Sequence, residues 1–244
     1  MGISAMNPVA LDDVLTRADV WRGNALAQGS AAGCTTGYAE LDAQLPGGGW
    51  PRGALVEILL AAAPGLNVAG VGEVSLLLPA LARHTRNGGF AALIAPALAV
   101  HAPAWAAAGV ELSRLILVTP AREAHQDTLW AAEQTLRSGA VGFALAWLPQ
   151  AEAGSLKRLQ RAAETGGSCA VVFRPAPCAG QSSPAALRLL VSGAGEGASV
   201  SIVKRRGPPL ARPIPVAVAR PRCITRRARA TEFAALLHTA PLCA

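Results

Sequence analysis

The residues best placed for chemistry lie where an apolar run, Ala54–Leu60, leads through a Pro/Gly-containing stretch to an apolar-periodic segment starting at Glu73. Strand, loop and helix in this order bind phosphates when glycines, a lysine and a hydroxyl stand at the corner. Here Gly72 and Glu73 stand there, and the only two lysines, Lys157 and Lys204, lie far downstream. A carboxylate repels a triphosphate in a partly buried site. The residues at this corner therefore predict the scaffold of a nucleotide hydrolase that does not bind ATP tightly.

Glu73 also has an ordinary structural interpretation. An acidic residue in the first turn of a helix interacts favourably with the helix dipole. The two interpretations are compatible, because neither supplies a cation for phosphate.

No other residues have the spacing of a catalytic or metal site. The four histidines lack metal-binding spacing, and Ser75 and Ser138 have no evident His/Asp partner. The five cysteines contain no C-x-x-C pair, which indicates reduced thiols in a cytoplasmic protein. We therefore expect a protein that is not an enzyme and has no cofactor or metal ion.

The elements that must position these residues form one α/β domain with appendages. The chain has 244 residues, of which 52% are hydrophobic and 15% charged, so it can bury a core. Apolar runs alternate with helical periodicity, as in a mostly parallel sheet covered by helices on both faces. The predicted strands are 54–60, 89–95, 114–118, 141–147 and 168–173, followed by 199–203 and 213–218, which could pair in antiparallel fashion. The predicted helices are 8–26, 36–45, 73–86, 123–138 and 152–165.

The chain shows no secretory signal and no convincing membrane segment. Its start lacks a basic region and soon reaches Asp12 and Asp13. The uncharged stretch 87–110 contains Pro96 and Pro103, so we interpret it as a buried strand plus a loop. A cytoplasmic location is the expectation.

Two blocks of the sequence resemble the ATPase core of RecA recombinases. The first comprises 36–42 and 47–58, and the second, 137–147, is similar to the approach to the Walker B strand. By this register Trp147 stands where a magnesium-binding aspartate is expected, and Ala97 falls near the place of the glutamate that activates water. With lysine, metal-binding acid and general base all missing, ordinary P-loop hydrolysis has no residues to perform it.

The resemblance implies three segments. These are an N-terminal helix or arm at 1–30, a RecA-like core with a degenerate P-loop at 31–219, and an Arg-rich tail with a short helix at 220–244. In RecA-type assemblies an N-terminal segment packs on the neighbouring core, so the helix at 8–26 could cap or join a filament. We also expect the Trp147 ring to fill space that a nucleotide and Mg²⁺ would otherwise occupy.

A narrower resemblance is to the ImuA family, the RecA-like accessory proteins of bacterial damage-inducible translesion DNA synthesis. The matching pieces are Val20–Gly23, Gly70–Glu73 with Leu76–Leu81, Ala146–Pro149 and Lys204–Pro208. The family implies a noncatalytic component of mutasome assembly that works with RecA, ImuB and, through ImuB, an error-prone DNA polymerase. A SulA-type cell-division inhibitor acting on FtsZ is the alternative, and an ATPase with an unusual loop is disfavoured by the missing lysine.

Basic residues gather near the C-terminus. No acidic residue lies between Glu196 and Glu232, while the net charge of the whole chain is +7. The basic residues between them are Lys204, Arg205, Arg206, Arg212, Arg220, Arg222, Arg226, Arg227 and Arg229. This stripe could bind DNA phosphates or an acidic partner protein, or could simply be a solvated tail. Without aromatic residues it predicts little sequence selectivity.

The end of the chain has the spacing of a short amphipathic helix. Phe233, Leu236 and Leu237 would share one face, which could dock into a partner groove or pack back on the core. We interpret four other aromatic residues as core or interface anchors: Trp21, Trp50, Trp105 and Trp130.

Overall fold

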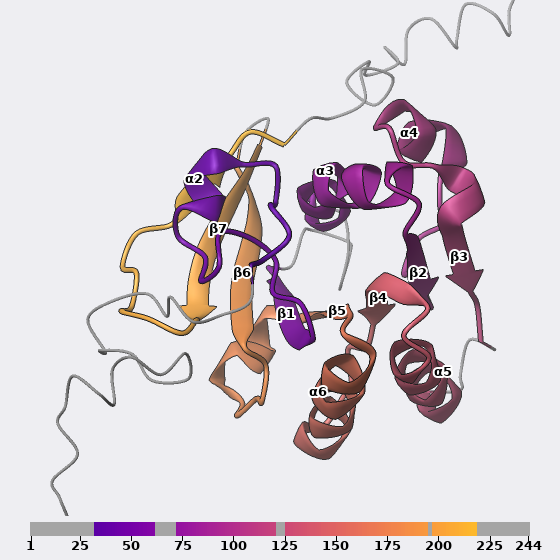
Figure 1. Cartoon of the computed structure of the whole chain (residues 1–244). Helices are drawn as coiled ribbons and strands as arrows, with labels where there is room; N and C mark the ends of the chain where they lie inside the picture. Colours follow the sequence, from indigo (N-terminus) through magenta and orange to yellow (C-terminus); the bar gives the residue numbers. More distant parts are fainter. Residues whose placement is uncertain (1–31, 62–71, 121–124, 195–196, 219–244) are drawn as a thin grey trace, which may run out of the picture.

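The chain folds around one eight-stranded sheet in the order β3-β2-β4-β5-β1-β6-β7-β8 (Figure 1). The computed structural model describes residues 32–61, 72–120, 125–194 and 197–218. From β3 to β6 in this order every neighbouring pair of strands is parallel, and β7 and β8 are added in antiparallel fashion. The expected mixed α/β fold with a mostly parallel sheet is confirmed. The N-terminal helix predicted at 8–26 and the tail at 220–244 lie outside the described residues.

The strands are β1 Ala54–Leu60, β2 Phe90–Ile94, β3 Leu115–Val118, β4 Val141–Trp147, β5 Cys169–Pro175, β6 Leu187–Ala194, β7 Gly197–Lys204 and β8 Ile214–Val216. The α-helices are α2 Ala39–Asp42, α3 Glu73–Arg86, α4 Ala102–Ala107, α5 His125–Arg137 and α6 Ala153–Gly166. Two 3₁₀ helices, η1 Leu112–Arg114 and η2 Ala176–Gly180, precede β3 and follow β5.

Helices cover both faces of the central strands, which explains why those strands are continuous apolar runs. All seven residues of β1 are buried. Val56 and Ile58 belong to the apolar core that α3 covers, while Leu55 belongs to the core under α5 and α6. Figure 1 shows α3 on one side of the sheet and α5 and α6 on the other. Leucines of α3 and alanines of α6 supply much of the apolar contact.

A small anchored segment leads the chain into β1. Asp42 accepts hydrogen bonds from the Thr35 hydroxyl at 2.6 Å and the Thr36 amide at 2.7 Å, which holds the short helix α2 against this turn. Gly37 lies so close to α3 that a Cβ there would stand 2.5 Å from the Cβ of Pro79, and its φ is +91°. Only glycine fits both conditions.

Several predicted boundaries were wrong. The helix predicted at 36–45 extends only over Ala39–Asp42, because side-chain bonds to Asp42 replace helical bonds before it. The stretch 87–110 contains α4 in addition to β2, where a strand plus a loop was predicted. β6 was missed, since it follows a Pro/Ser-rich connection that contains the short 3₁₀ helix η2 and no α-helix. No helix in the described ranges is long and apolar enough to cross a membrane.

Candidate functional site

The corner between β1 and α3 has a strand before it and a helix after it, as the sequence predicted. β1 ends at Leu60 and α3 begins at Glu73, while the connecting residues 62–71 lie outside the described part. Gly72 precedes the helix with φ +91° and offers no capping side chain. Glu73 is only 4% exposed. A buried acidic residue therefore stands in the first turn of α3, at the end of a helix where phosphates commonly bind.

Aromatic rings fill the carboxyl ends of the neighbouring strands. Trp147 is the last residue of β4 and is 7% exposed. Its ring stacks on Phe173 of β5, with centroids 4.5 Å apart and planes inclined by 29°. Both rings belong to the core that includes Leu76 and Leu77 of α3. In open α/β sheets ligands bind outside the carboxyl ends of the strands, so this stack occupies space next to the usual ligand crevice.

Ala97, which the resemblance places near a general base, carries no functional group. Ala97 is exposed and lies beyond the end of β2, after Ala95, whose φ is +49°. A methyl group neither binds a metal ion nor activates water. Within the described ranges no group of three or more His, Cys, Asp or Glu side chains could hold a metal ion. The structure thus places Trp147 at the end of β4, Ala97 beyond the end of β2, and Glu73 at the start of α3.

A buried ionic cluster in the middle of the sheet escaped the sequence analysis. Glu57 of β1 is fully buried and accepts hydrogen bonds from Arg174 of β5, at 2.7 Å, and from Arg188 of β6. Both arginines are also nearly buried. A charge inside an otherwise apolar strand needs a partner, and Glu57 was the signal that could have revealed the cluster.

The cluster fixes the connection between β5 and β6. Arg188 donates to the carbonyl oxygens of Cys178, Ala179 and Gln181, at the end of η2. Arg174 donates to the carbonyl of Ala151 and to the side chain of Gln181. The two guanidinium groups thereby donate to main-chain carbonyl groups around η2 and before α6, and one carboxylate balances only one of the two positive charges.

The described part of the basic stripe is partly used to hold the fold. Arg205 donates to the main chain of Gln44 and Pro208, and burial lowers the pKa of its guanidinium. Lys204 donates to the Ser183 carbonyl at 2.9 Å. Arg206 and Arg212 are exposed. The other basic residues and the predicted tail helix lie outside the described ranges: Arg220, Arg222, Arg226, Arg227, Arg229, Phe233, Leu236 and Leu237.

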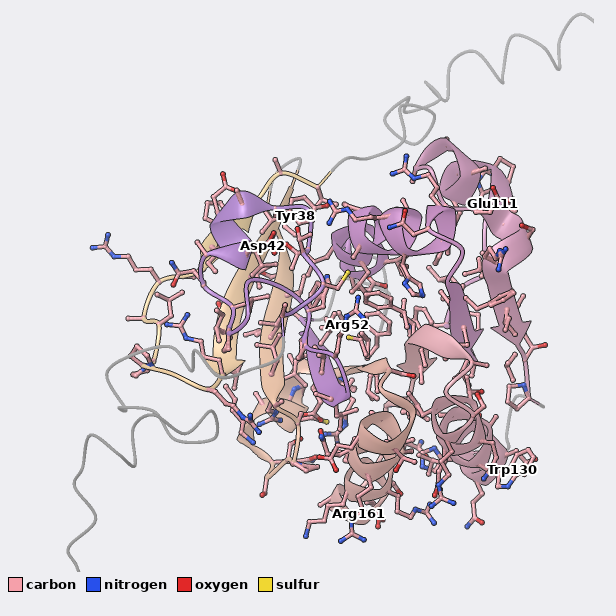
Figure 2. The ribbon with its side chains drawn as sticks, viewed as in Figure 1. Tyr38, Asp42, Arg52, Glu111, Trp130 and Arg161 are labelled. Atoms are coloured by element: carbon pink, nitrogen blue, oxygen red, sulfur yellow. The ribbon has the colours of Figure 1, made fainter. Side chains whose placement is uncertain are left out.

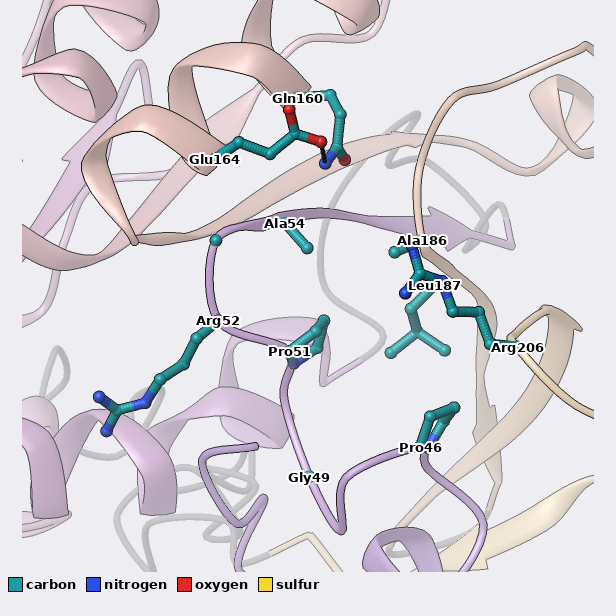
Figure 3. Close-up of a pocket in the computed structure, with 11 residues that line it drawn as sticks. Pro46, Gly49, Pro51, Arg52, Ala54, Gln160, Glu164, Ala186, Leu187 and Arg206 are labelled. Atoms are coloured by element: carbon teal, nitrogen blue, oxygen red, sulfur yellow. Dashed lines mark hydrogen bonds between the residues drawn. The ribbon is translucent and has the colours of Figure 1, made fainter. Parts of the chain in front are cut away.

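A small cavity of about 130 Å³ opens at the amino ends of β1 and β6 (Figure 3). Arg206, Gln160 and Glu164 line it, and the Gln160 amide donates to Glu164 at 2.7 Å. Arg52 also borders the cavity, but Figure 3 shows its side chain extending away. The cavity lies at the opposite end of the strands from the β1–α3 corner. It is therefore not a remnant of a nucleotide site.

A wider groove, of about 560 Å³, lies along α5 and α6. Its lining includes Trp130, which is 64% exposed, and Glu133, which pairs with Arg137 at 2.9 Å and lies 3.7 Å from Arg158. Trp130 is thus a surface residue, which fits an interface anchor. Trp50 and Trp105 are buried and act as core anchors.

The three thiols in the described part are free, namely Cys34, Cys169 and Cys178. Burial raises the pKa of the Cys34 and Cys169 thiols. Both therefore stay protonated at neutral pH and are poor nucleophiles.

Comparison with known proteins adds one structural likeness. No family profile and no curated protein sequence matches the chain. Among solved structures, SulA from Pseudomonas aeruginosa is similar over 49% of this chain and 97% of that one, with 23% sequence identity and a TM-score of 0.39. Because this score is below 0.5, the likeness does not establish a shared fold or function.

Proposed function

We propose that this protein is a noncatalytic, RecA-like accessory factor of SOS-induced translesion DNA synthesis. In this role the α/β core serves as a docking scaffold for RecA, ImuB or both, and an error-prone polymerase joins through ImuB. The basic tail could add contacts with DNA. The resemblance of the sequence to the ImuA family is the source of the named partners.

One observation carries the noncatalytic part of the proposal. Where the resemblance places the magnesium-binding aspartate, the buried ring of Trp147 stacks on Phe173. Phosphoryl transfer depends on cations that neutralise developing charge and on a group that orients water. A stacked indole performs neither task, and the carboxylate of Glu73 at the helix N-terminus adds negative charge. Binding of other proteins is then the function that the scaffold retains.

The test of partner choice is a pull-down with the tagged full chain against purified RecA, ImuB and FtsZ at low and high salt. Capture of RecA or ImuB supports the proposal. Capture of FtsZ alone would move the protein to the class of SulA-type division inhibitors, and capture of none of the three would overturn the docking role.

The test of chemistry is ATP binding and hydrolysis by the wild type and by the Glu73→Lys/Trp147→Asp double variant. We expect no hydrolysis by either protein, because the position of Ala97 still lacks a carboxylate. Steady hydrolysis by the wild-type protein, retained after removal of any contaminating ATPase, would contradict the noncatalytic role.

A further inference from the structure

The groove of about 560 Å³ along α5 and α6 lies mainly between the N-terminal halves of the two helices. At their last turns the helices touch, since a Cβ on Gly166 would stand 1.9 Å from the carbonyl oxygen of Leu136. Toward the other end the lining includes Leu129 of α5 and Ser155 of α6. Sites for small molecules are concave and usually measure roughly 300–1,000 Å³. The groove is therefore large enough for one small organic ligand.

Trp130 gives this groove an aromatic surface. Its side chain is 64% exposed, whereas the other tryptophans of the described part, Trp50, Trp105 and Trp147, are at most 8% exposed. Figure 2 shows Trp130 on α5 at the periphery of the molecule. Among the described residues, no other ring and no guanidinium group lies against the indole. The indole face can therefore stack on the ring of a ligand.

One cation of the lining retains hydrogen-bonding capacity. Glu133 forms its close ion pair with Arg137, at 2.9 Å. The Nε atom of Arg158 lies 3.7 Å from the other oxygen of Glu133, which is longer than a hydrogen bond. Within the described ranges the guanidinium group of Arg158 donates no hydrogen bond, and its side chain is 58% exposed. Arg158 can therefore bind an anionic group in the groove.

One carboxylate of the lining is also uncommitted. Glu152 occupies the N-cap position of α6, but its side chain makes no capping hydrogen bond. It is exposed and has no ion pair or hydrogen bond from a side chain in the described part. Because Arg137 neutralises Glu133, the lining offers a ligand one positive group, Arg158, and one negative group, Glu152.

We infer that the α5–α6 groove binds a zwitterionic aromatic molecule, of which a free aromatic α-amino acid is the simplest example. The ligand ring would stack on Trp130 beside Leu129. Its carboxylate would accept hydrogen bonds from Arg158, and its ammonium group would donate to Glu152. This site goes beyond the proposed docking function and does not depend on it.

The charges of the lining argue against a nucleotide in the same groove. A phosphate monoester carries about −1.5 to −2 charges at neutral pH. It would meet the carboxylates of Glu133 and Glu152, with Arg158 as the one arginine in the lining. A ligand with a single carboxylate and its own ammonium group places opposite charges next to both Arg158 and Glu152. The groove therefore favours the zwitterion.

The experiment titrates the full chain with L-phenylalanine, using calorimetry for affinity and tryptophan emission as the reporter of Trp130. Three analogues each lack one of the recognised groups. These are 2-phenylethylamine without the carboxylate, 3-phenylpropionate without the ammonium group, and L-leucine without the ring. Each should bind about tenfold or more weakly than L-phenylalanine, because one contact is lost. Adenosine monophosphate should also bind more weakly than L-phenylalanine.

Variants of the two charged residues should give a crossed pattern. Arg158→Gln should weaken L-phenylalanine and 3-phenylpropionate and leave 2-phenylethylamine unchanged. Glu152→Gln should weaken L-phenylalanine and 2-phenylethylamine and leave 3-phenylpropionate unchanged. Arg161→Gln is the matched control, since Arg161 lies on α6 outside the groove lining, and it should bind all ligands as the wild type does. Figure 2 shows Arg161 extending from the outer side of α6.

Two variants of Trp130 test the stacking contact. Trp130→Phe should retain calorimetric binding but lose the change in emission, and Trp130→Ala should weaken binding by about tenfold or more. No saturable binding of L-phenylalanine at several millimolar would overturn the inference. Equal weakening of all ligands by Arg158→Gln and Glu152→Gln would also overturn it, as would tighter binding of adenosine monophosphate than of L-phenylalanine.

Discussion

At the scale of single residues, two sets of side chains are informative: those at the positions assigned by the resemblance, and those of the buried ionic cluster. The resemblance to RecA recombinases assigns the reactive positions of a hydrolase to Glu73, Ala97 and Trp147, and none of the three carries the predicted side chain. In contrast, Glu57 is buried and charged because Arg174 and Arg188 surround it. Burial of three charges gains little overall stability compared with apolar residues, but removal of one partner leaves the others uncompensated.

The first prediction concerns this cluster. Glu57→Gln removes the single negative charge and leaves two buried guanidinium groups, so the free energy of unfolding should fall by about 3–5 kcal/mol. Chemical denaturation measured by circular dichroism checks it. Glu40→Gln on the exposed first turn of α2 is the matched control and should change stability by less than about 0.5 kcal/mol. Equal small effects of both changes would show that the cluster is not a stability determinant.

A second prediction at this scale uses the buried thiol of Cys169. Burial raises its pKa above the ordinary value of 9.0. Below that pH the thiol is protonated in both folded and unfolded chains and adds no pH dependence. Above it the unfolded chain ionises first, so the free energy of unfolding should fall as pH rises, by at most about 1.4 kcal/mol per pH unit.

Denaturation between neutral and alkaline pH would measure this dependence. Cys169→Ala should lower stability at neutral pH through the lost packing but should lose less stability on alkalinisation than the wild type. If the free energy of unfolding depends on pH in the same way for the two proteins, the alkaline loss of stability is not due to the Cys169 thiol.

At the scale of elements, close packing of helices determines which small residues are required. α6 has a glycine at each end. A Cβ on Gly166 would stand 1.9 Å from the Leu136 carbonyl oxygen of α5, whereas a Cβ on Gly154 would meet nothing within 4 Å. The α5–α6 pair that covers one face of the sheet therefore depends on Gly166.

These two glycines provide the third prediction. Gly166→Ala should destabilise the protein by about 1–3 kcal/mol, since the backbone of α5 must move. Gly154→Ala should be neutral or stabilising by about 0.4–1 kcal/mol, because alanine restricts the unfolded chain. Thermal unfolding of the two variants compares them directly. The interpretation fails if Gly166→Ala unfolds at the wild-type temperature.

At the scale of the whole molecule, charge and apolar surface are unevenly distributed. The exposed apolar side chains gather around β3, at one edge of the sheet, and the basic residues gather toward the C-terminus. Residues 219–244 contain five arginines and one glutamate, so their removal lowers the net charge from +7 to +3. A docking role and a nucleic-acid role would thus use different parts of the chain.

This separation yields the fourth prediction. A chain ending at Val218 should bind single-stranded DNA more weakly than the full chain, and its affinity should depend less steeply on salt, because up to five phosphate contacts are lost. Titration of fluorescent DNA with each of the two proteins at several salt concentrations measures how steeply each affinity depends on salt. Identical salt slopes would exclude the tail as the DNA contact.

The sequence by itself determined the positions of most central elements. β1 and α3 agree with their predicted boundaries, because apolar runs and helical periodicity are local properties of the chain. The absence of lysine, aspartate and glutamate from the expected catalytic positions could also be read directly. Short elements such as α2 and α4 were mispredicted, because side-chain bonds and tertiary packing override weak local preferences.

Only the tertiary structure decided which distant residues meet. Glu57 lies 117 residues from Arg174 and 131 from Arg188, and their contact depends on β1 standing between β5 and β6. The positions of β3 and β8 at the two edges of the sheet likewise follow from strand order. Periodicity along a chain specifies which face of a strand is buried, but it contains no information about the neighbour of that strand.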